Sequence, residues 1–171
     1  MIQLVEEVDG YEMLCISCWV HDMVLDLIRS ISSEENFIAI LDKNKEFGGR
    51  ARRLVLQNHN KRITEAHTDM LEQLRSFISF GCDIDKQWVP LSSFKFVRVL
   101  DIHTSTGEMK CRHLKNLRNL HHLRYLRLIG SDIELPEEVG TLKFLQTLDV
   151  DGLKEGKMAF SMGLLTQLLC L

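Results

Sequence analysis

Residues 114–150 read LKNLRNLHHLRYLRLIGSDIELPEEVGTLKFLQTLDV, and this stretch contains one six-residue pattern twice. Leu123-Arg-Tyr-Leu126-Arg-Leu128 is followed 22 residues later by Leu145-Gln-Thr-Leu148-Asp-Val150, and both copies fit L-x-x-L-x-L if valine replaces the last leucine. Side chains alternate across a strand, so the fourth and sixth residues of each copy point together toward a core, while their neighbours face outward. A single unit cannot bury its apolar edge alone, which predicts neighbouring units.

Further copies of the pattern begin at Ala51, Leu74, Val97 and Leu165. Six units therefore follow one another at intervals of 20 to 26 residues. This period is that of a leucine-rich repeat, whose units stack into a solenoid. The sequence predicts an α/β fold over 51–171, a leucine-rich-repeat solenoid of about five and a half units with parallel strands on its concave face. The polar insertion HTSTGEMK, in the longest unit, is expected to form a loop.

The composition is that of a folded chain without a strong net charge. Of the 171 residues, 45% are hydrophobic and 26% are charged, and the formal net charge of −3 argues against a dedicated nucleic-acid-binding domain. No apolar run reaches the roughly 18 residues of a membrane span, and the acidic start MIQLVEEVDG does not resemble a signal peptide. Five irregularly spaced cysteines argue against a disulfide framework. We therefore expect a cytoplasmic protein that does not bind membranes.

Residues 1–35 carry a pattern different from that of the repeats. Ile2–Val5 and Met13–Trp19 are strand-like, and Asp9-Gly10 is a turn signal between them, which predicts a β-hairpin. A helix is expected to begin near Asp22, a favourable N-cap residue, because apolar side chains follow at helical spacing as far as Ile31.

The segment that leads into the repeats is short. Phe37–Leu41 predicts a strand, and the polar, glycine-containing segment 42–50 predicts a connector. Upstream, Cys15 and Cys18 would point to opposite faces of a strand. We therefore expect them to be buried, inert cysteines rather than metal ligands, and we predict no metal site.

Val20-His21-Asp22, followed by the apolar sequence MVLDLI, resembles the MHD motif that ends the nucleotide-binding module of plant intracellular immune receptors of the NB-ARC–leucine-rich-repeat class. Valine stands where the family has methionine. The order of segments is similar too: a hairpin, the motif, a helix, SSEENF, a short linker and then RRLVLQN. The repeats look like those of grass receptors of the coiled-coil type. The resemblance implies that 1–41 is the C-terminal part of the winged-helix region, 42–50 a linker and 51–171 the repeats.

The same resemblance implies a nucleotide-contacting role for His21, because the motif histidine of the family contacts the phosphate of bound ADP. Asp22 would orient the backbone and cap the helix, whose N-terminus favours phosphate. The alternative is that His21 is a surface residue ahead of a capped helix. The chain contains no G-x-x-x-x-G-K-[ST] loop. We therefore expect no cofactor in this chain, and ADP or ATP only if a P-loop region is supplied upstream.

The register of the repeats selects the side chains of the concave face. Equivalent residues of adjacent parallel strands stack about 4.8 Å apart, so Asp101, Arg127 and Asp149 are expected to form an alternating charge ladder. Such a mixed surface favours recognition of a protein: a pathogen effector, a host protein or the NB-ARC module. A solvated face without a ligand is the alternative. The candidate binding residues are Arg53, Gln57, Phe80, Asp101, His103, Tyr125, Arg127, Ile129, Asp149 and Asp151.

The segment Lys110–Arg127 is basic and contains no acidic residue. Clustered cations can bind nucleic acid through counterion release. However, the leucines at 114, 117, 120 and 123 assign the segment to a solenoid turn, which favours a solvated or docking surface over nucleic acid. No histidine lies near a nucleophile motif, so we predict no catalytic residues and no enzyme.

Two functions fit these observations. The first is a fragment of an intracellular plant immune receptor, whose repeats recognise a protein in the defence response and make autoinhibitory contacts. The alternative is a free-standing, truncated interaction module without nucleotide switching.

Overall fold

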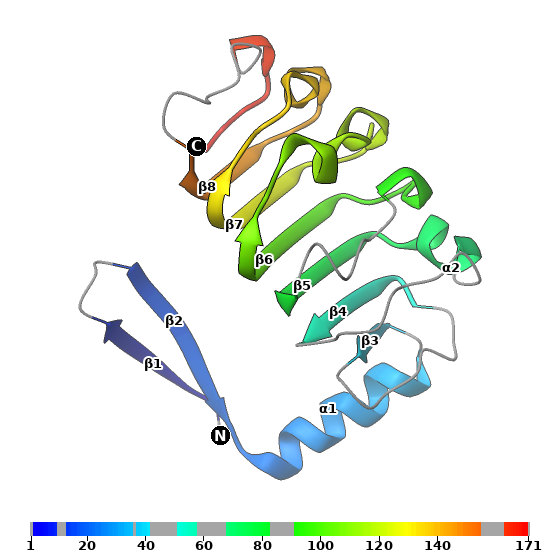
Figure 1. The fold of residues 1–171 in the computed structure, drawn as a ribbon. Helices are drawn as coiled ribbons and strands as arrows, with labels where there is room; N and C mark the ends of the chain where they lie inside the picture. Colours follow the sequence, from blue (N-terminus) through cyan, green and yellow to red (C-terminus); the bar gives the residue numbers. More distant parts are fainter. Residues whose placement is uncertain are drawn as a thin grey trace. The chain divides into compact units, whose positions relative to one another are not determined.

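The computed structural model describes residues 2–9, 13–35, 37–41, 51–57, 68–82, 91–154 and 163–170. The chain divides into two compact units, Met1–Phe37 and Ile38–Leu171. The first contains a two-stranded antiparallel sheet and one helix (Figure 1). β1 (Ile2–Asp9) pairs with β2 (Met13–Val20), and α1 (Asp22–Glu34) follows. The expected hairpin and helix are therefore confirmed, with longer strands than predicted, and the turn between the strands lies outside the described residues.

The second unit is a parallel sheet with the strand order β3-β4-β5-β6-β7-β8. Each strand begins one repeat, and the strands lie side by side in Figure 1 with the short helices on the far side of each turn. This is the predicted solenoid. Its strands are β3 (Ile38–Leu41), β4 (Arg53–Gln57), β5 (Ser76–Cys82), β6 (Val99–Glu108), β7 (Tyr125–Ile133) and β8 (Thr147–Leu153).

The core of this unit is built from the leucine positions of the pattern, which stack from strand to strand. Alternation in each strand sends the fourth and sixth residues of the pattern inward. The ladder pairs the fourth residues directly, and each of them is at most 1% exposed. They are Leu54, Phe77, Leu100, Leu126 and Leu148.

The segments that return to the next strand are short helical turns. They include α2 (Thr68–Gln73) and the 3-10 helices Leu91–Ser93, Cys111–Leu114, Leu117–Asn119 and Glu137–Thr141. Backbone hydrogen bonds of 2.9 and 3.0 Å connect the N–H of Leu120 to the carbonyl of Leu117 and the N–H of Leu123 to that of Leu120. Three residues per turn align side chains at positions i and i+3. Leucines spaced by three therefore all face the core, and these three are at most 1% exposed.

The boundary between the two units differs from the expected one. The strand predicted at 37–41 exists, but it was assigned to the winged-helix region, and this assignment is wrong. β3 pairs in parallel with β4, so that Ala39 lies beside Leu54 and Leu41 beside Leu56. β3 is thus the edge strand of the repeat sheet. Alanine at the fourth position concealed the pattern in the sequence.

The last repeat has a different register from the predicted one. The N–H of Cys170 donates to the carbonyl of Gln146 at 3.2 Å, just as the N–H of Thr147 donates to Arg124 at 3.0 Å in the preceding repeat. Leu168 therefore takes the place that Leu145 has one repeat earlier, and the predicted start at Leu165 is wrong by three residues. The error arises because leucines recur every three residues in the return segments, so L-x-x-L fits more than one phase.

The expected loop HTSTGEMK is also corrected. Its first six residues continue β6 as far as Glu108, which pairs with Ser131 of an equally extended β7. The register between the two strands shifts after His103 and Ile129, so the additional residues are accommodated as an irregularity in the ladder.

Candidate binding surface

The outward-facing residues of β4 to β8 form three columns on the concave face, which we define as the solvent-facing side of these strands. The middle column runs through Val55, Ile78, Asp101, Arg127 and Asp149, which are neighbours in the ladder. The structure thus places all ten candidate residues on the predicted face, on five consecutive strands. The rest of the set belongs to the flanking columns: Arg53 and Tyr125 on one side, and Gln57, Phe80, His103, Ile129 and Asp151 on the other.

Charged side chains meet at the centre of this face, although not in the simple ladder that was expected. Arg127 Nε lies 3.0 Å from Asp149 Oδ2 and forms the expected ion pair between β7 and β8. Asp101 is the ladder neighbour of Arg127, but its 2.9 Å contact is to Nε2 of His103, two residues along the same strand. The strand period of two places both side chains on one face, which explains the contact.

These contacts do not satisfy all the polar atoms involved. Asp101 Oδ1, His103 Nε2 and Arg127 Nε are buried and make no well-aligned hydrogen bond. Burial raises the pKa of the Asp101 carboxyl above its ordinary value of 3.8, while nearby His103 and Arg127 oppose this shift. Burial likewise raises the pKa of the Tyr125 hydroxyl. The centre of the face is therefore a partly desolvated polar cluster, in which a partner could supply better-aligned hydrogen bonds.

Apolar and aromatic groups border the charged cluster. The Phe80 ring packs edge-on against the His103 ring, with 4.8 Å between centroids, and Phe80 remains 38% exposed. Tyr125 and Ile129 are half-buried on β7. Arg53, Gln57 and Asp151 are exposed toward the outer parts of the face. The surface therefore offers both an apolar anchor and charged groups with fixed positions, which is the composition of protein interfaces.

His21 and Asp22 lie in the first unit, at the start of α1. The carbonyl of His21 accepts from the N–H groups of Val24 and Leu25 at 2.8 and 3.0 Å, and its Nδ1 accepts from the N–H of Met23 at 3.3 Å. His21 is therefore the N-cap, and the prediction that Asp22 caps the helix is wrong. Asp22 is the first helical residue, where its charge still favours the positive end of the helix dipole.

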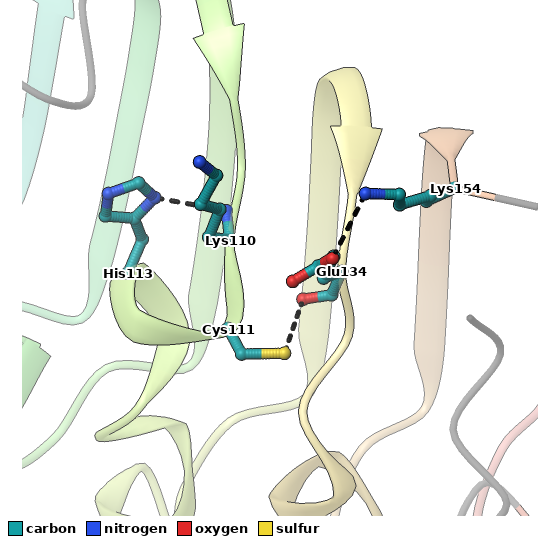
Figure 2. A network of polar contacts seen from close by, with 5 residues as sticks. All are labelled: Lys110, Cys111, His113, Glu134 and Lys154. Atoms are coloured by element: carbon teal, nitrogen blue, oxygen red, sulfur yellow. Dashed lines mark hydrogen bonds and ion pairs between the residues drawn. The ribbon is translucent and has the colours of Figure 1, made fainter.

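A polar network that the sequence analysis missed connects three successive repeats where the strands end (Figure 2). The Cys111 thiol donates to the carbonyl of Glu134 at 3.6 Å, and Lys154 Nζ lies 3.3 Å from Glu134 Oε1. The buried His113 ring accepts from the N–H of Lys110 at 3.2 Å through Nδ1. Only the long-range stacking brings these residues together, so no local pattern announced them. Their partners lie within the fold, which indicates a structural role.

The basic segment Lys110–Arg127 is divided by the fold. His113 is buried, Arg127 is on the concave face, and Lys110, Lys115 and Arg118 are among the residues exposed along the return segment. In the part of the chain that the structure describes, no group of three or more histidine, cysteine, aspartate or glutamate side chains could hold a metal ion. No described helix is both long enough and apolar enough to cross a membrane.

Comparison with known proteins establishes the class. A family model described as a leucine-rich repeat region matches residues 73–171. This match covers more than half of the chain, so the protein belongs to the leucine-rich-repeat family.

More particular similarities are to disease resistance proteins of rice, Oryza sativa subsp. japonica. The chain is 33% identical to Pik-2 over 138 residues, which cover 77% of this chain and 13% of that protein. It is 31% identical to PIK6-NP over 156 residues, covering 87% and 15%, and 30% identical to RGA4 over 135 residues, covering 78% and 13%. The resemblance to plant disease resistance proteins is confirmed, and the chain spans 13–15% of the length of these relatives. The match to their repeat region suggests a non-catalytic module for protein interaction.

Proposed function

We propose that this chain is part of an intracellular plant immune receptor that works in the cytoplasm, and that its repeats bind a protein partner through the concave face. The family match and the named rice relatives support the receptor assignment. The partner is a pathogen-derived or host protein, or the nucleotide-binding module of the same receptor, to which the repeats would make autoinhibitory contacts. Binding rather than catalysis is the activity of this surface.

The central cluster on β7 is the observation that carries the binding proposal. Tyr125 and Arg127 are half-buried near the middle of five strands, and Asp149 holds the Arg127 guanidinium at 3.0 Å. Tyrosine and arginine are enriched among residues that dominate interface energies. Side chains that are already held in place lose little conformational entropy when a partner binds.

The binding proposal is tested by comparing the proteins captured from leaf extract by the native chain and by a Tyr125→Ala/Arg127→Ala variant. A Lys115→Ala/Arg118→Ala variant is the matched control, because both residues are exposed on a return segment. A true concave-face partner is lost with the first variant and retained with the second, and its purified form must reproduce this difference in a binary titration. Equal binding of all three chains would refute the proposal.

We further propose that His21 contacts the nucleotide phosphate when a P-loop region is present in the same polypeptide. Its Nδ1 already accepts a backbone hydrogen bond, so a neutral ring carries its proton on Nε2 and can donate it to a phosphate oxygen. The positive end of α1 at this position supports anion binding.

This second proposal requires the endogenous polypeptide. An antibody against 131–150 should detect a species several times longer than 171 residues, and that species should bind ADP more tightly than its His21→Ala variant. The 171-residue chain alone should give no heat in a calorimetric titration with ADP. Detection of the short product alone would favour a free-standing module and would remove the role of His21.

A further inference from the structure

A column of four arginines follows the edge of the sheet where the strands begin. The four residues occupy equivalent positions in successive repeats, because the N–H of each donates to the carbonyl of the preceding one. The hydrogen bonds are 2.8 Å from Arg75 to Arg52, 2.8 Å from Arg98 to Arg75 and 2.9 Å from Arg124 to Arg98. We name these residues the arginine column. The same backbone ladder continues to Gln146, where the run of basic residues ends.

The arginine column is exposed, and its charges have no counter-ion on the protein. All four side chains are exposed. In the described part of the chain, each ion pair involves other residues: Lys95 pairs with Glu72, for instance, and Arg127 with Asp149. Like charges stacked on neighbouring strands repel one another. A negatively charged partner would relieve this repulsion and gain charge-assisted hydrogen bonds.

An apolar stripe runs beside the column. Phe96 and Arg98 flank the buried Val97, and His122 and Arg124 flank the buried Leu123 in the next repeat. The rings of Phe96 and His122 stack with 5.9 Å between centroids. Phe144 has the equivalent position one repeat later, and both phenylalanines are more than half exposed, at 52% and 54%. The edge therefore presents a basic stripe and an aromatic stripe next to each other.

We propose that this edge is a docking surface for an acidic amphipathic helix of a partner protein, a surface separate from the concave face. Neighbouring arginines are spaced by about 4.8 Å, the distance between strands. Carboxylates on one face of an α-helix recur about every 5.4 Å, a mismatch that long arginine side chains absorb over four positions. In an extended strand, same-face carboxylates recur at about 6.7 Å and soon fall out of step.

The two separate stripes also favour a helix over nucleic acid. Proteins that bind single strands combine a basic groove with aromatic rings on which successive bases stack. Here the arginines form one line and the aromatic rings another, which matches a helix with an acidic stripe beside an apolar stripe. A guanidinium can bind a carboxylate through two parallel hydrogen bonds, which gives the docking its directionality.

The test is a fluorescence anisotropy titration of the full 171-residue chain with a labelled amphipathic helical peptide, whose glutamates share one face beside an apolar stripe. The native chain should bind it, with an affinity that falls as salt rises. Arg75→Glu/Arg98→Glu should weaken binding about tenfold or more. Lys115→Glu/Arg118→Glu changes the net charge equally on a different surface and should bind like the native chain. Tyr125→Ala/Arg127→Ala should also retain binding, which separates this surface from the concave face.

Three further arms decide between explanations. A peptide of the same composition with its glutamates spread around the helix should bind weakly, and equal binding would overturn the proposed geometry. Tighter binding of an oligo-dT strand, lost in Arg75→Glu/Arg98→Glu, would assign the edge to nucleic acid instead. A peptide with lysines in place of the glutamates should bind Arg75→Glu/Arg98→Glu better than the native chain. If circular dichroism shows that this variant is unfolded, Arg75→Gln/Arg98→Gln replaces it, and undiminished binding there refutes the proposal.

Discussion

Gly152 lies against Gly130 of the preceding repeat so closely that a Cβ on Gly152 would overlap the Gly130 carbonyl. Gly152 also has φ of +88°, a conformation that L side chains rarely adopt. A Cβ on Gly130 would in turn collide with the Thr104 hydroxyl. The ends of β6, β7 and β8 can therefore approach one another only because two of these three positions lack a side chain.

Gly152→Ala should consequently destabilise the fold by roughly 2–4 kcal/mol, since it combines backbone strain with a clash against main-chain atoms. The measurement is the free energy of unfolding in urea. Gly163→Ala is the matched control, because a Cβ there meets nothing within 4 Å, and it should change stability by less than about 0.5 kcal/mol. Similar effects of the two substitutions would contradict the close packing of the glycines.

Leu126→Ala should cost about 2–5 kcal/mol, because Leu126 is 0% exposed and stacks between Leu100 and Leu148 in the core. Leu169→Ala removes the same atoms from a side chain that is 82% exposed and should be nearly neutral. The urea midpoint of each variant provides the comparison. A neutral Leu126→Ala would show that the inner columns are not packed as a continuous core.

The register of the last repeat makes a prediction about thiol reactivity. In the predicted phase Cys170 would face the core, whereas the observed hydrogen bonds place it at an outward position, where it is exposed. Maleimide added to the folded chain should therefore modify Cys170, together with the exposed Cys111. Peptide mapping by mass spectrometry locates the label, and labelling in urea identifies all five cysteines. Protection of Cys170 in the folded state would restore the original phase.

Asp101 predicts an unusual pH dependence. Burial raises its pKa in the folded protein above the ordinary 3.8, against the opposing effects of His103 and Arg127, and Asp149 adds to the rise. The folded state therefore holds this proton more tightly than the unfolded state does. The stabilisation is present below pH 3.8 and is lost as the pH rises from there through the folded-state pKa.

Unfolding free energies of the native chain and of Asp101→Asn, measured from pH 3 to pH 7, isolate this effect. The native chain should lose stability relative to the variant as the pH rises across that window, because only the native chain must bury a charge at position 101. A difference that is independent of pH, or one that grows in favour of the native chain as the pH rises, would contradict the raised pKa.

Local sequence pattern was sufficient to predict the hairpin, the first helix, the solenoid and the residues of the concave face. The reason is that strand alternation and the repeat period are both written into nearby residues, such as Leu123, Leu126 and Leu128. The resemblance carried by Val20-His21-Asp22 and the repeats agreed with the rice relatives found by comparison.

Other features were decided by packing between repeats. The phase of Leu165 and Leu168 was ambiguous because leucines recur every three residues, and only the hydrogen bonds to Gln146 select one register. Ala39 joined the core without a visible motif, because a neighbouring strand was available to pair with it. The partner of Asp101, the network around Glu134 and the alignment of the arginine column likewise depend on stacking. A one-dimensional pattern states which way a side chain points, but only the three-dimensional ladder determines which residue it meets.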